Sequence, residues 1–303
     1  MTRGASGRTS RGWGPAVRRE HDGGCAGGAG ARTRDMSHQL LSEGRLAPPA
    51  PAPASRRVWV TALLDLVFPP FCPVCEQRLG EGRRDPLCGG CWEALERIAP
   101  PYCRVCGLPF SRLPSSEADP TRGVDHLCGR CRRRLPPFAY ARAAVRYGEV
   151  AREAVHAFKF GGRRSLAAPL GDLLAAMDPA GFPVGAPALL APIPLHPRRE
   201  RERGFNQALL LARRVGSAWK VPVRADVLVR TLATRPQTEL TAEARRANVR
   251  GAFALRRPEL VAGRHVVLVD DVFTTGSTVT ACARCLKEGG ASAVGVLTVA
   301  RAV

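Results

Sequence analysis

The sequence predicts an α/β fold: a parallel sheet flanked by helices, preceded by a small cysteine-rich segment. Two observations support this prediction. From Phe138 onward, short apolar runs typical of strands alternate with helical patterns, as they do in parallel sheets. Before that point, cysteines occur in pairs with two intervening residues. The apolar fraction of 45% is enough to bury a core, and the absence of any 18-residue apolar run argues against membrane insertion.

The 303 residues divide into three predicted regions. Residues 1–57 are rich in Gly, Ala, Arg and Pro, and we expect them to form a disordered basic tail. Residues 58–137 are expected to hold a short helix and the cysteine pairs, and residues 138–303 the α/β domain. A faint twin-arginine pattern at 55–59 does not predict export, because Asp65 interrupts the apolar stretch that follows it.

The expected elements follow from the apolar pattern. Residues 58–68 predict a short amphipathic helix that Pro69 ends. The strand at 265–271 is of the buried type, because its apolar residues do not alternate with polar ones. Gly289 suits the end of a helix over 277–288. The other expected elements are strands at 139–147, 188–195 and 292–300, and helices at 149–160, 164–176 and 201–219.

The chain is strongly basic, with a formal net charge of +20 and a pI near 10.9. Residues 1–57 carry 10 basic and 4 acidic residues (net +6), residues 58–140 carry 11 and 9 (+2), and residues 141–303 carry 25 and 13 (+12). An anionic partner, either nucleic acid or phosphate, accounts for this charge; so does a compositional preference for arginine at solvated positions. The nearly neutral cysteine-rich segment is unlike a DNA-reading finger.

Four cysteine pairs follow one another in the second region. A gap of two residues lets both thiolates of a tight turn reach one tetrahedral ion, so four such turns predict two structural Zn²⁺ sites. Sequential pairing of the turns is simplest, and a crossed arrangement stays open. With four thiolates in each site, no position remains for a catalytic water. The predicted ligands are Cys72, Cys75, Cys88, Cys91, Cys103, Cys106, Cys128 and Cys131.

Other uses of these cysteines are weaker alternatives. Disulfides need an oxidising compartment, whereas the sequence predicts a cytoplasmic protein, and a redox motif needs one pair rather than four. His126 is a candidate replacement ligand beside Cys128. A fifth pair, Cys282 and Cys285, lies within the predicted helix at 277–288 and is expected to pack in the core as small apolar side chains.

The stretch VVLVDDVFTTGST, residues 266–278, predicts a phosphate-binding loop. A buried strand ends at Asp270 and Asp271, and a loop rich in hydroxyl groups then opens a helix, whose first N–H groups favour an anion. Two carboxylates would repel that anion, so we expect them to accept hydrogen bonds from the vicinal hydroxyls of a ribose. The loop has neither a Walker nor a Rossmann pattern. Its residues are Thr274, Thr275, Gly276, Ser277 and Thr278.

This stretch resembles the phosphoribosyl pyrophosphate (PRPP) motif of type I phosphoribosyltransferases, although Phe273 stands where that motif usually has a smaller aliphatic residue. Residues 58–303 as a whole are similar to the ComF family, which joins a double zinc ribbon to a type I phosphoribosyltransferase-like parallel sheet. The segments that carry the resemblance are FCPVC at 71–75, PIPLHPRRERERGFNQALLLA at 192–212, RPQTEL at 235–240, RRANVRGAF at 245–253 and the PRPP motif.

The resemblance implies roles for several residues. Asp270 and Asp271 would hold the ribose hydroxyls and residues 274–278 the 5′-phosphate, while Leu195 and His196 would lie near a pyrophosphate that Mg²⁺ bridges. Candidate cations for that pyrophosphate or another polyanion are Arg198, Arg199, Arg201, Arg203 and Lys159; a solvated surface explains them equally well. Gln237 and Arg245 lie in a polar stretch that is a candidate lid.

Three functions are compatible with these features. The first is a pentosyltransferase of nucleoside metabolism that transfers phosphoribose from PRPP and releases pyrophosphate; the catalytic residues and the acceptor are not evident from the sequence. The second, suggested by the family's association with DNA uptake during competence, is a non-catalytic PRPP-binding accessory that handles single-stranded DNA. In the third, the ribbons form a docking surface for a competence helicase.

Overall fold

The structure, a computed structural model, describes residues 70–80, 85–110, 126–232 and 251–303, all of which belong to one unit, Ala54–Val303. The predicted tail, the predicted helix at 58–68 and the candidate lid residues Gln237 and Arg245 lie outside the described residues. Within the described part of the chain, no helix is long and apolar enough to cross a membrane.

The central element is a four-stranded parallel sheet with the strand order β1-β6-β5-β2. Its strands are β1 (Tyr140–Arg146), β2 (Leu189–Pro192), β5 (His265–Phe273) and β6 (Ala293–Arg301). The two central strands are buried on both faces, which explains their continuous apolar runs. All four predicted strands are therefore present, within a few residues of the expected bounds.

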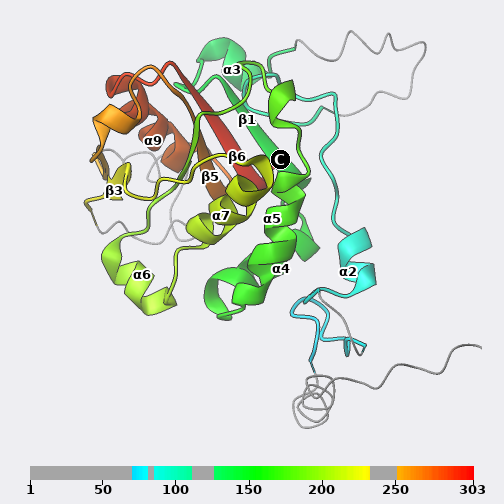
Figure 1. Cartoon of the computed structure of the whole chain (residues 1–303). Helices are drawn as coiled ribbons and strands as arrows, with labels where there is room; N and C mark the ends of the chain where they lie inside the picture. The colour runs from blue at the N-terminus through cyan, green and yellow to red at the C-terminus, as the bar shows by residue number, and fades with distance from the viewer. Residues whose placement is uncertain (1–69, 81–84, 111–125, 233–250) are drawn as a thin grey trace, which may run out of the picture. The chain divides into compact units, whose positions relative to one another are not determined.

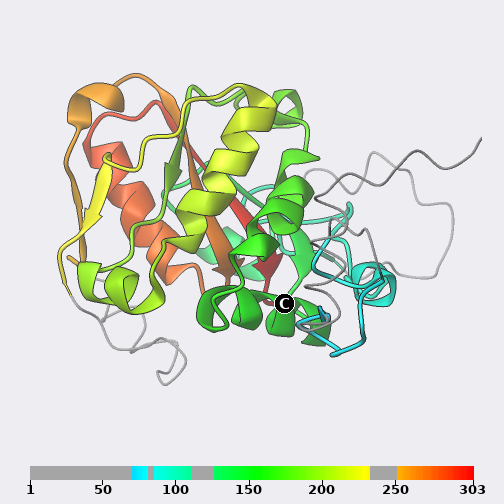
Figure 2. The same cartoon turned by 60° about the horizontal axis from the view of Figure 1, so that its bottom comes forward.

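Helices cover both faces of the sheet (Figures 1 and 2). Alternate strand residues show the division: Val267 and Val269 pack in one apolar cluster with α4, α5 and α7, whereas Val266 and Leu268 pack in a second cluster with α9. The helices are α4 (Glu149–Phe160), α5 (Ala167–Ala175), α6 (Pro197–Arg203), α7 (Gln207–Trp219) and α9 (Ser277–Glu288), with 3-10 turns at Arg164–Leu166, Pro179–Gly181 and Pro258–Leu260.

The structure differs from the sequence-based prediction at 201–219. The single predicted helix is two helices, α6 and α7, which Gly204 separates. Gly204 adopts a left-handed conformation (φ 77°) that ends α6, and the Asn206 side chain then accepts hydrogen bonds from the N–H groups of Ala208 and Leu209 to begin α7. Arg203, the last residue of α6, interacts electrostatically with Asp270 and Asp271 of β5.

A short antiparallel pair was not predicted. It consists of β3 (Leu228–Arg230) and β4 (Phe253–Leu255), and α9 packs against β4. Strands of three residues are too short to show an apolar period in the sequence. The pair matters because it places Arg230 near the site described below.

Each half of the cysteine-rich segment contains one short helix, α2 (Gly89–Glu93) or α3 (Gly129–Arg133). The first half joins the apolar cluster of α4, α5 and α7 through Cys72 and Leu87, and the second joins the α9 cluster through its four cysteines. A bridge between Arg97 and Val145 ties the first half to β1. The N–H of Ala141 donates to the carbonyl of Val105 at 2.6 Å and ties the second half to the same strand.

Candidate functional site

The loop between β5 and α9 has the geometry of an anion site. Gly276 adopts a left-handed conformation (φ 75°) and precedes a helix of 12 residues, so the positive end of the α9 dipole lies at the loop. The hydroxyls of Thr275 and Ser277 lie 2.8 Å apart, and the N–H of Ser277 donates to the Thr275 hydroxyl at 3.4 Å. Thr274 and Thr278 are half-buried in the same loop.

A glycine is required at position 276 for a second reason. A Cβ atom there would lie 2.7 Å from Cζ of Phe273, because the Phe273 ring packs directly beneath the turn. Phe273 therefore supports the loop from the core side. Its ring fills the space that Gly276 leaves open because glycine has no Cβ atom.

The segment after β2 lies beside this loop. Strands β2 and β5 are parallel neighbours, with Pro192 opposite Val269, so both segments leave the carboxyl edge of the sheet. Leu195 and His196 are half-buried there, and Nδ1 of His196 accepts a hydrogen bond from the N–H of Arg198 at 3.2 Å. The structure thus places the two predicted ligand-binding segments at adjacent strand ends.

The two acidic residues at the end of β5 have different surroundings. The Asp271 carboxyl is only 5% exposed, and its Oδ1 lies 2.8 Å from Nζ of Lys159 on α4. Oδ2 of Asp271 has no hydrogen-bond partner among the described residues. Oδ1 of Asp270 accepts the N–H of Asp271 at 2.9 Å, and its carboxylate interacts electrostatically with Arg230.

Four cations from three elements gather around these acids. Besides Lys159, Arg203 of α6 interacts electrostatically with both carboxyls, and Arg230 of β3 interacts with Asp270. Arg199 of α6 repels both Arg203 and Arg230, so the like charges lie near one another. Two carboxylates cannot neutralise four cations, and the surplus positive charge suits an anionic ligand.

The pKa values of these groups follow from burial and mutual charge. Burial, and secondarily the charge of Asp271, raises the pKa of Asp270 to about 7, although Lys159 and Arg230 act against the rise. Burial alone would lower the pKa of Lys159, but the Asp271 carboxylate outweighs burial and raises it. Burial lowers the pKa values of Arg203 and Arg230. Asp270 therefore exchanges its proton near neutral pH, and Lys159 stays charged.

The eight paired cysteines form two separate groups of four, in sequential order: Cys72, Cys75, Cys88 and Cys91, then Cys103, Cys106, Cys128 and Cys131. In each group, the sulfur atoms lie within 4.8 Å of one another. Sulfur–sulfur distances of 3.5 Å between Cys75 and Cys88, and 3.6 Å between Cys106 and Cys128, suit the edge of about 3.8 Å of a tetrahedral zinc thiolate. Both clusters are consistent with zinc sites, and His126 belongs to neither.

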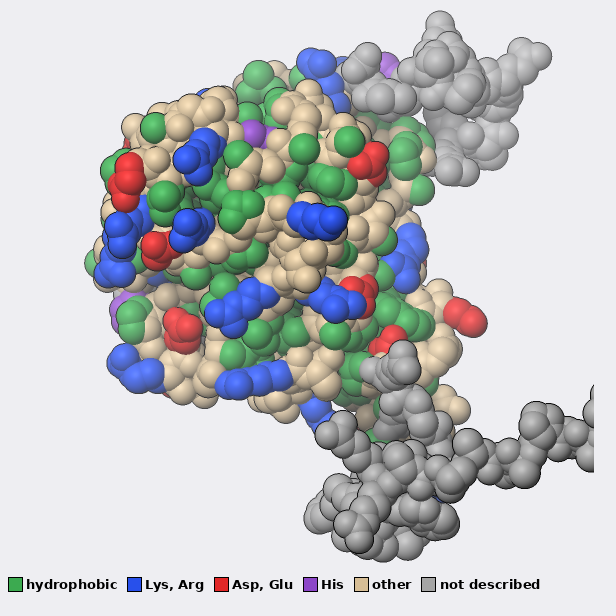
Figure 3. All heavy atoms as spheres, viewed as in Figure 1, with side chains coloured by type: hydrophobic (Ala, Val, Ile, Leu, Met, Phe, Trp, Pro, Cys, Tyr) green, Lys and Arg blue, Asp and Glu red, His purple; other side chains and the backbone are tan. Residues whose placement is uncertain are grey.

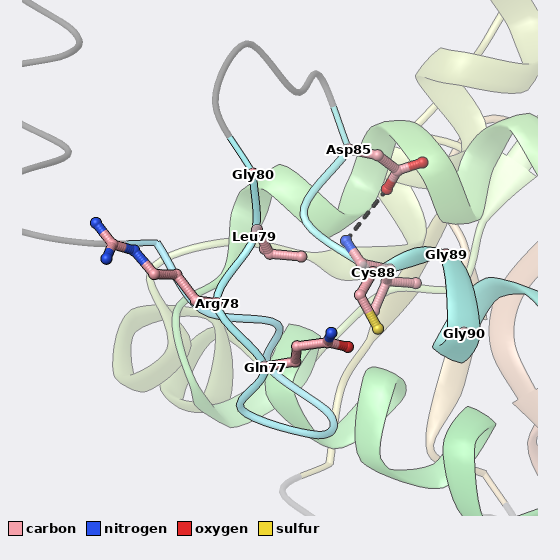
Figure 4. Close-up of a pocket in the computed structure, with 9 residues that line it drawn as sticks. Gln77, Arg78, Leu79, Gly80, Asp85, Cys88, Gly89 and Gly90 are labelled. Carbon is pink, nitrogen blue, oxygen red and sulfur yellow. Dashed lines mark hydrogen bonds between the residues drawn. The ribbon is translucent and has the colours of Figure 1, made fainter.

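The first cysteine group lies beside a surface hollow of about 450 Å³ (Figure 4). Gln77, Leu79 and Cys88 line it, together with Asp85, which accepts a hydrogen bond from the N–H of Leu87 at 3.3 Å. Among the described lining residues the one cation is Arg78, whose guanidinium points away from the hollow (Figure 4), and none of these residues belongs to the anion site.

The structure separates the predicted cations into two groups. Lys159 and Arg203 interact with the acids, and Arg199 lies near Arg203 and Arg230. Arg198 instead forms an exposed ion pair with Glu202 at 2.9 Å, and Arg201 is exposed. Cys282 is fully buried in the α9 apolar cluster, and the thiol of Cys285 donates to the carbonyl of Phe253, which confirms that this pair belongs to the core.

Three arginines near the loop were missed by the sequence analysis. They are Arg230, described above, Arg130 of α3, and Arg301 at the end of β6. Nη2 of Arg130 donates to the carbonyl of Thr275 at 2.6 Å, and Nη2 of Arg301 lies 3.5 Å from Sγ of Cys106. No motif marks these residues, because their positions depend on contacts between segments distant in sequence.

Two family models match the chain. The model of the double zinc ribbon domain matches residues 63–132, and the model of the phosphoribosyl transferase domain matches residues 204–302. These matches agree with the cysteine groups and with the part of the parallel sheet that carries the loop.

Curated relatives span most of the chain. It is 34% identical over 243 residues to the DNA utilization protein YhgH of Escherichia coli K12, covering 78% of this chain and 99% of that protein. It is 30% identical over 223 residues to competence protein F of Haemophilus influenzae, covering 72% and 92%. It is 29% identical over 212 residues to competence protein ComFC of Bacillus subtilis, covering 69% and 81%.

Among solved structures, the glutamine PRPP amidotransferase of B. subtilis matches this chain with a TM-score of 0.30 and 21% identity. The match covers 44% of this chain and 25% of that enzyme, so this chain spans about a quarter of its length. Adenine phosphoribosyltransferase from Leishmania tarentolae matches with a TM-score of 0.28 and 15% identity, covering 45% and 70%.

Proposed function

Because the chain belongs to the ComF family, with a double zinc ribbon and a phosphoribosyltransferase-type domain, we propose that it binds PRPP with Mg²⁺ at the loop 274–278. The observation that supports this most directly is the position of the loop: it opens a long helix at the carboxyl edge of the sheet, directly after two acids that cations surround. A phosphate and a sugar can then be held side by side.

Each part of the site has a separate task in this proposal. The backbone N–H groups at the start of α9 and the hydroxyls of Thr275 and Ser277 hold the 5′-phosphate. Asp270 and Asp271 accept hydrogen bonds from the ribose hydroxyls, and the ion pair with Lys159 holds the Asp271 carboxylate in place. Arg199, Arg203 and Arg230, with the segment around Leu195 and His196, supply positive charge for the pyrophosphate. Mg²⁺, when bound with PRPP, supplies further positive charge between the pyrophosphate and the hydroxyls.

We further propose that the protein transfers phosphoribose. In that step, the bond between C1′ and the pyrophosphate oxygen breaks, a bond from the acceptor to C1′ forms, and the acceptor loses a proton. The arginines stabilise the charge that develops on the departing pyrophosphate, which is the main contribution that fixed cations make to such reactions.

Calorimetry of PRPP with Mg²⁺ tests the binding site. We expect the wild type to bind and the double variant Asp270→Asn/Asp271→Asn to bind at least tenfold more weakly, because the amides lose charge-assisted hydrogen bonds from the ribose. Equal affinities would remove the site assignment. Pyrophosphate release in the presence of a panel of bases and amines tests turnover separately, and no release with any acceptor would leave PRPP binding without catalysis.

The second candidate function is the handling of single-stranded DNA, and the observation that favours it is the net charge of +12 on residues 141–303. On the face shown in Figure 3, Lys and Arg side chains are spread among apolar and acidic ones rather than gathered in one patch. Contacts of such Lys and Arg side chains with phosphates carry no sequence preference. The relatives named for DNA utilization and competence are compatible with this function, as is a competence helicase as partner.

The salt dependence of binding tests the DNA function. If phosphate contacts carry the binding, the logarithm of the affinity for single-stranded DNA falls linearly with the logarithm of the salt concentration, and PRPP changes the affinity if the two ligands communicate. A slope near zero counts against the DNA function and leaves the PRPP proposal intact. Both functions assume a cytoplasmic protein, where zinc-binding thiolates stay reduced.

A further inference from the structure

The second cysteine group lies against the loop 274–278. Among the described residues, no hydrogen bond or ion pair links the first group to this loop. All four sulfur-bearing residues of the second group are buried, and they share one apolar cluster with Phe273 of β5 and Val279 of α9. The segment that follows the first group contacts β1 instead: the N–H of Arg146 donates to the carbonyl of Glu96 at 2.8 Å.

Arg130 makes a direct contact from the second group to the loop. It lies in α3 between the ligands Cys128 and Cys131, and its guanidinium donates to the carbonyl of Thr275 at 2.6 Å. Thr275 is next to Gly276, whose left-handed conformation directs the loop N–H groups. A fixed carbonyl at position 275 fixes the peptide plane that carries the Gly276 N–H, so Arg130 restrains the loop without needing to touch a ligand.

Arg301 makes a second, buried contact. Arg301 is only 5% exposed. Its guanidinium lies 4.3 Å from the centroid of the Phe273 ring, and its Nη2 lies 3.5 Å from Sγ of Cys106. Nε and Nη1 of Arg301 have no hydrogen-bond partner among the described residues. A buried guanidinium needs a counter-charge, and four thiolates around one Zn²⁺ carry a net charge of about −2. The second cysteine group with zinc supplies that counter-charge.

These contacts form a continuous path. Zinc at the second group would fix Cys106 and, through Cys128 and Cys131, the start and the middle of α3. Arg301 then holds the Phe273 ring beneath Gly276, and Arg130 holds the carbonyl of Thr275. We propose that the second zinc ribbon is a positioning element of the anion loop, through Arg130 and Arg301, so that zinc binding at this group and phosphate binding at the loop strengthen each other. The coupling between zinc binding and phosphate binding rests on the proposed function, whereas the restraint of the loop by Arg130 and Arg301 does not.

Hydrogen exchange of the loop tests the restraint without any phosphoribosyl ligand. In the zinc-loaded full chain, Arg130→Met keeps the aliphatic stem and removes the donor, and we expect amides of 275–279 to exchange about tenfold faster, the effect of losing one charge-assisted hydrogen bond. Arg130→Lys keeps a charged donor and should restore most of the protection. Arg133→Met, an exposed residue of the same helix, should leave the loop unchanged. Equal protection in Arg130→Met and the wild type would overturn the proposal.

Zinc release tests the reciprocal coupling, because PRPP must raise the affinity for zinc by the factor by which zinc raises the affinity for PRPP, and a higher affinity at an unchanged association rate means slower release. With a zinc-selective chelator, we expect PRPP with Mg²⁺ to slow the loss of one zinc per chain about tenfold and to leave the other unaffected. Cys91→Ser, which disables the first site, should keep the slowed phase, and Cys131→Ser should abolish it. Slowing that persists in Cys131→Ser, or that is the same in Arg130→Met as in the wild type, contradicts the coupling.

The two failures can be told apart. If PRPP does not bind the wild type while Arg130→Met still exposes the loop to exchange, the proposed function fails and the restraint of the loop stands. If PRPP binds the wild type and Arg130→Met with equal affinity and equal exchange, the proposed function stands and the inference about the zinc ribbon fails.

Discussion

Nζ of Lys159 lies 2.8 Å from Oδ1 of Asp271, in an ion pair whose acidic member is only 5% exposed. The pair joins the last turn of α4 to the end of β5, two elements more than 100 residues apart in sequence. A buried carboxylate without such a partner is strongly destabilising, so Lys159 makes the burial of Asp271 tolerable and fixes one of the two acids that we assign to the ribose.

The first prediction concerns this ion pair. Lys159→Met leaves the Asp271 carboxylate buried without a counter-charge, and we expect a loss of about 3–5 kcal/mol in the free energy of unfolding, measured by urea denaturation. The double variant Lys159→Met/Asp271→Asn removes both charges and should recover most of that loss. If the single and double variants are equally unstable, the loss does not come from an unpaired Asp271 carboxylate.

The second prediction concerns pH. The pKa of Asp270 is about 7 in the folded protein and near 3.8 when exposed, so the folded state binds the extra proton between these values. Stability is greatest when the carboxyl is neutral and is lost as pH rises toward 7. Asp270→Asn cannot ionise. The difference in the free energy of unfolding between this variant and the wild type should therefore shift in favour of the variant by on the order of 2 kcal/mol between pH 5 and pH 8. Urea titrations at several pH values measure this difference, and a constant difference contradicts the raised pKa.

The third prediction concerns Gly276. A Cβ atom at this position meets the Phe273 ring at 2.7 Å and the residue also has a positive φ, so Gly276→Ala should destabilise the protein by about 2–4 kcal/mol and weaken PRPP binding. Gly263 is a matched control: its φ is +69° but nothing lies within 4 Å of an added Cβ. Gly263→Ala should lower the free energy of unfolding by only about 1–2 kcal/mol, which is the cost of a positive φ for an L-residue. Equal losses in the two variants would mean that the ring does not support the loop.

The fourth prediction concerns Arg230, which the sequence analysis did not identify. Arg230→Met should weaken pyrophosphate binding about tenfold, and because Arg230 lowers the pKa of Asp270, its loss should raise that pKa further. Arg201→Met removes an exposed arginine of α6 and should change neither quantity. Calorimetry with pyrophosphate and Mg²⁺ at several pH values measures both effects. Similar affinities in the two variants contradict the assignment of Arg230.

The fifth prediction concerns zinc content. Because the eight cysteines form two separate groups, freshly purified and reduced protein should contain about two zinc ions per chain. Cys91→Ser and Cys131→Ser should each retain about one. Elemental analysis measures this, and a content near zero in the wild type would refute the assignment of both groups.

Some features follow from local sequence alone. The strand at 265–271 and the helix at 277–288 were predicted because a buried apolar run and two closing glycines are local signals. The grouping of cysteines into two sets in sequential order was also the simplest expectation, and the structure confirms it. In contrast, the interruption at Gly204 was missed, because the arginine-rich segment before it and the apolar segment after it both favour a helix.

The sequence by itself predicted the groups on which our proposals depend: the cysteines for zinc, the loop for a phosphate, and the acids that precede that loop. Only the tertiary structure decided which cations serve that loop. Arg130, Arg230 and Arg301 come from the short helix α3, a three-residue strand and the last strand, and they approach the site only when the sheet has formed. Ligand groups are encoded in residue types at short spacing, whereas electrostatic partners depend on distances across the folded chain, which no local pattern records.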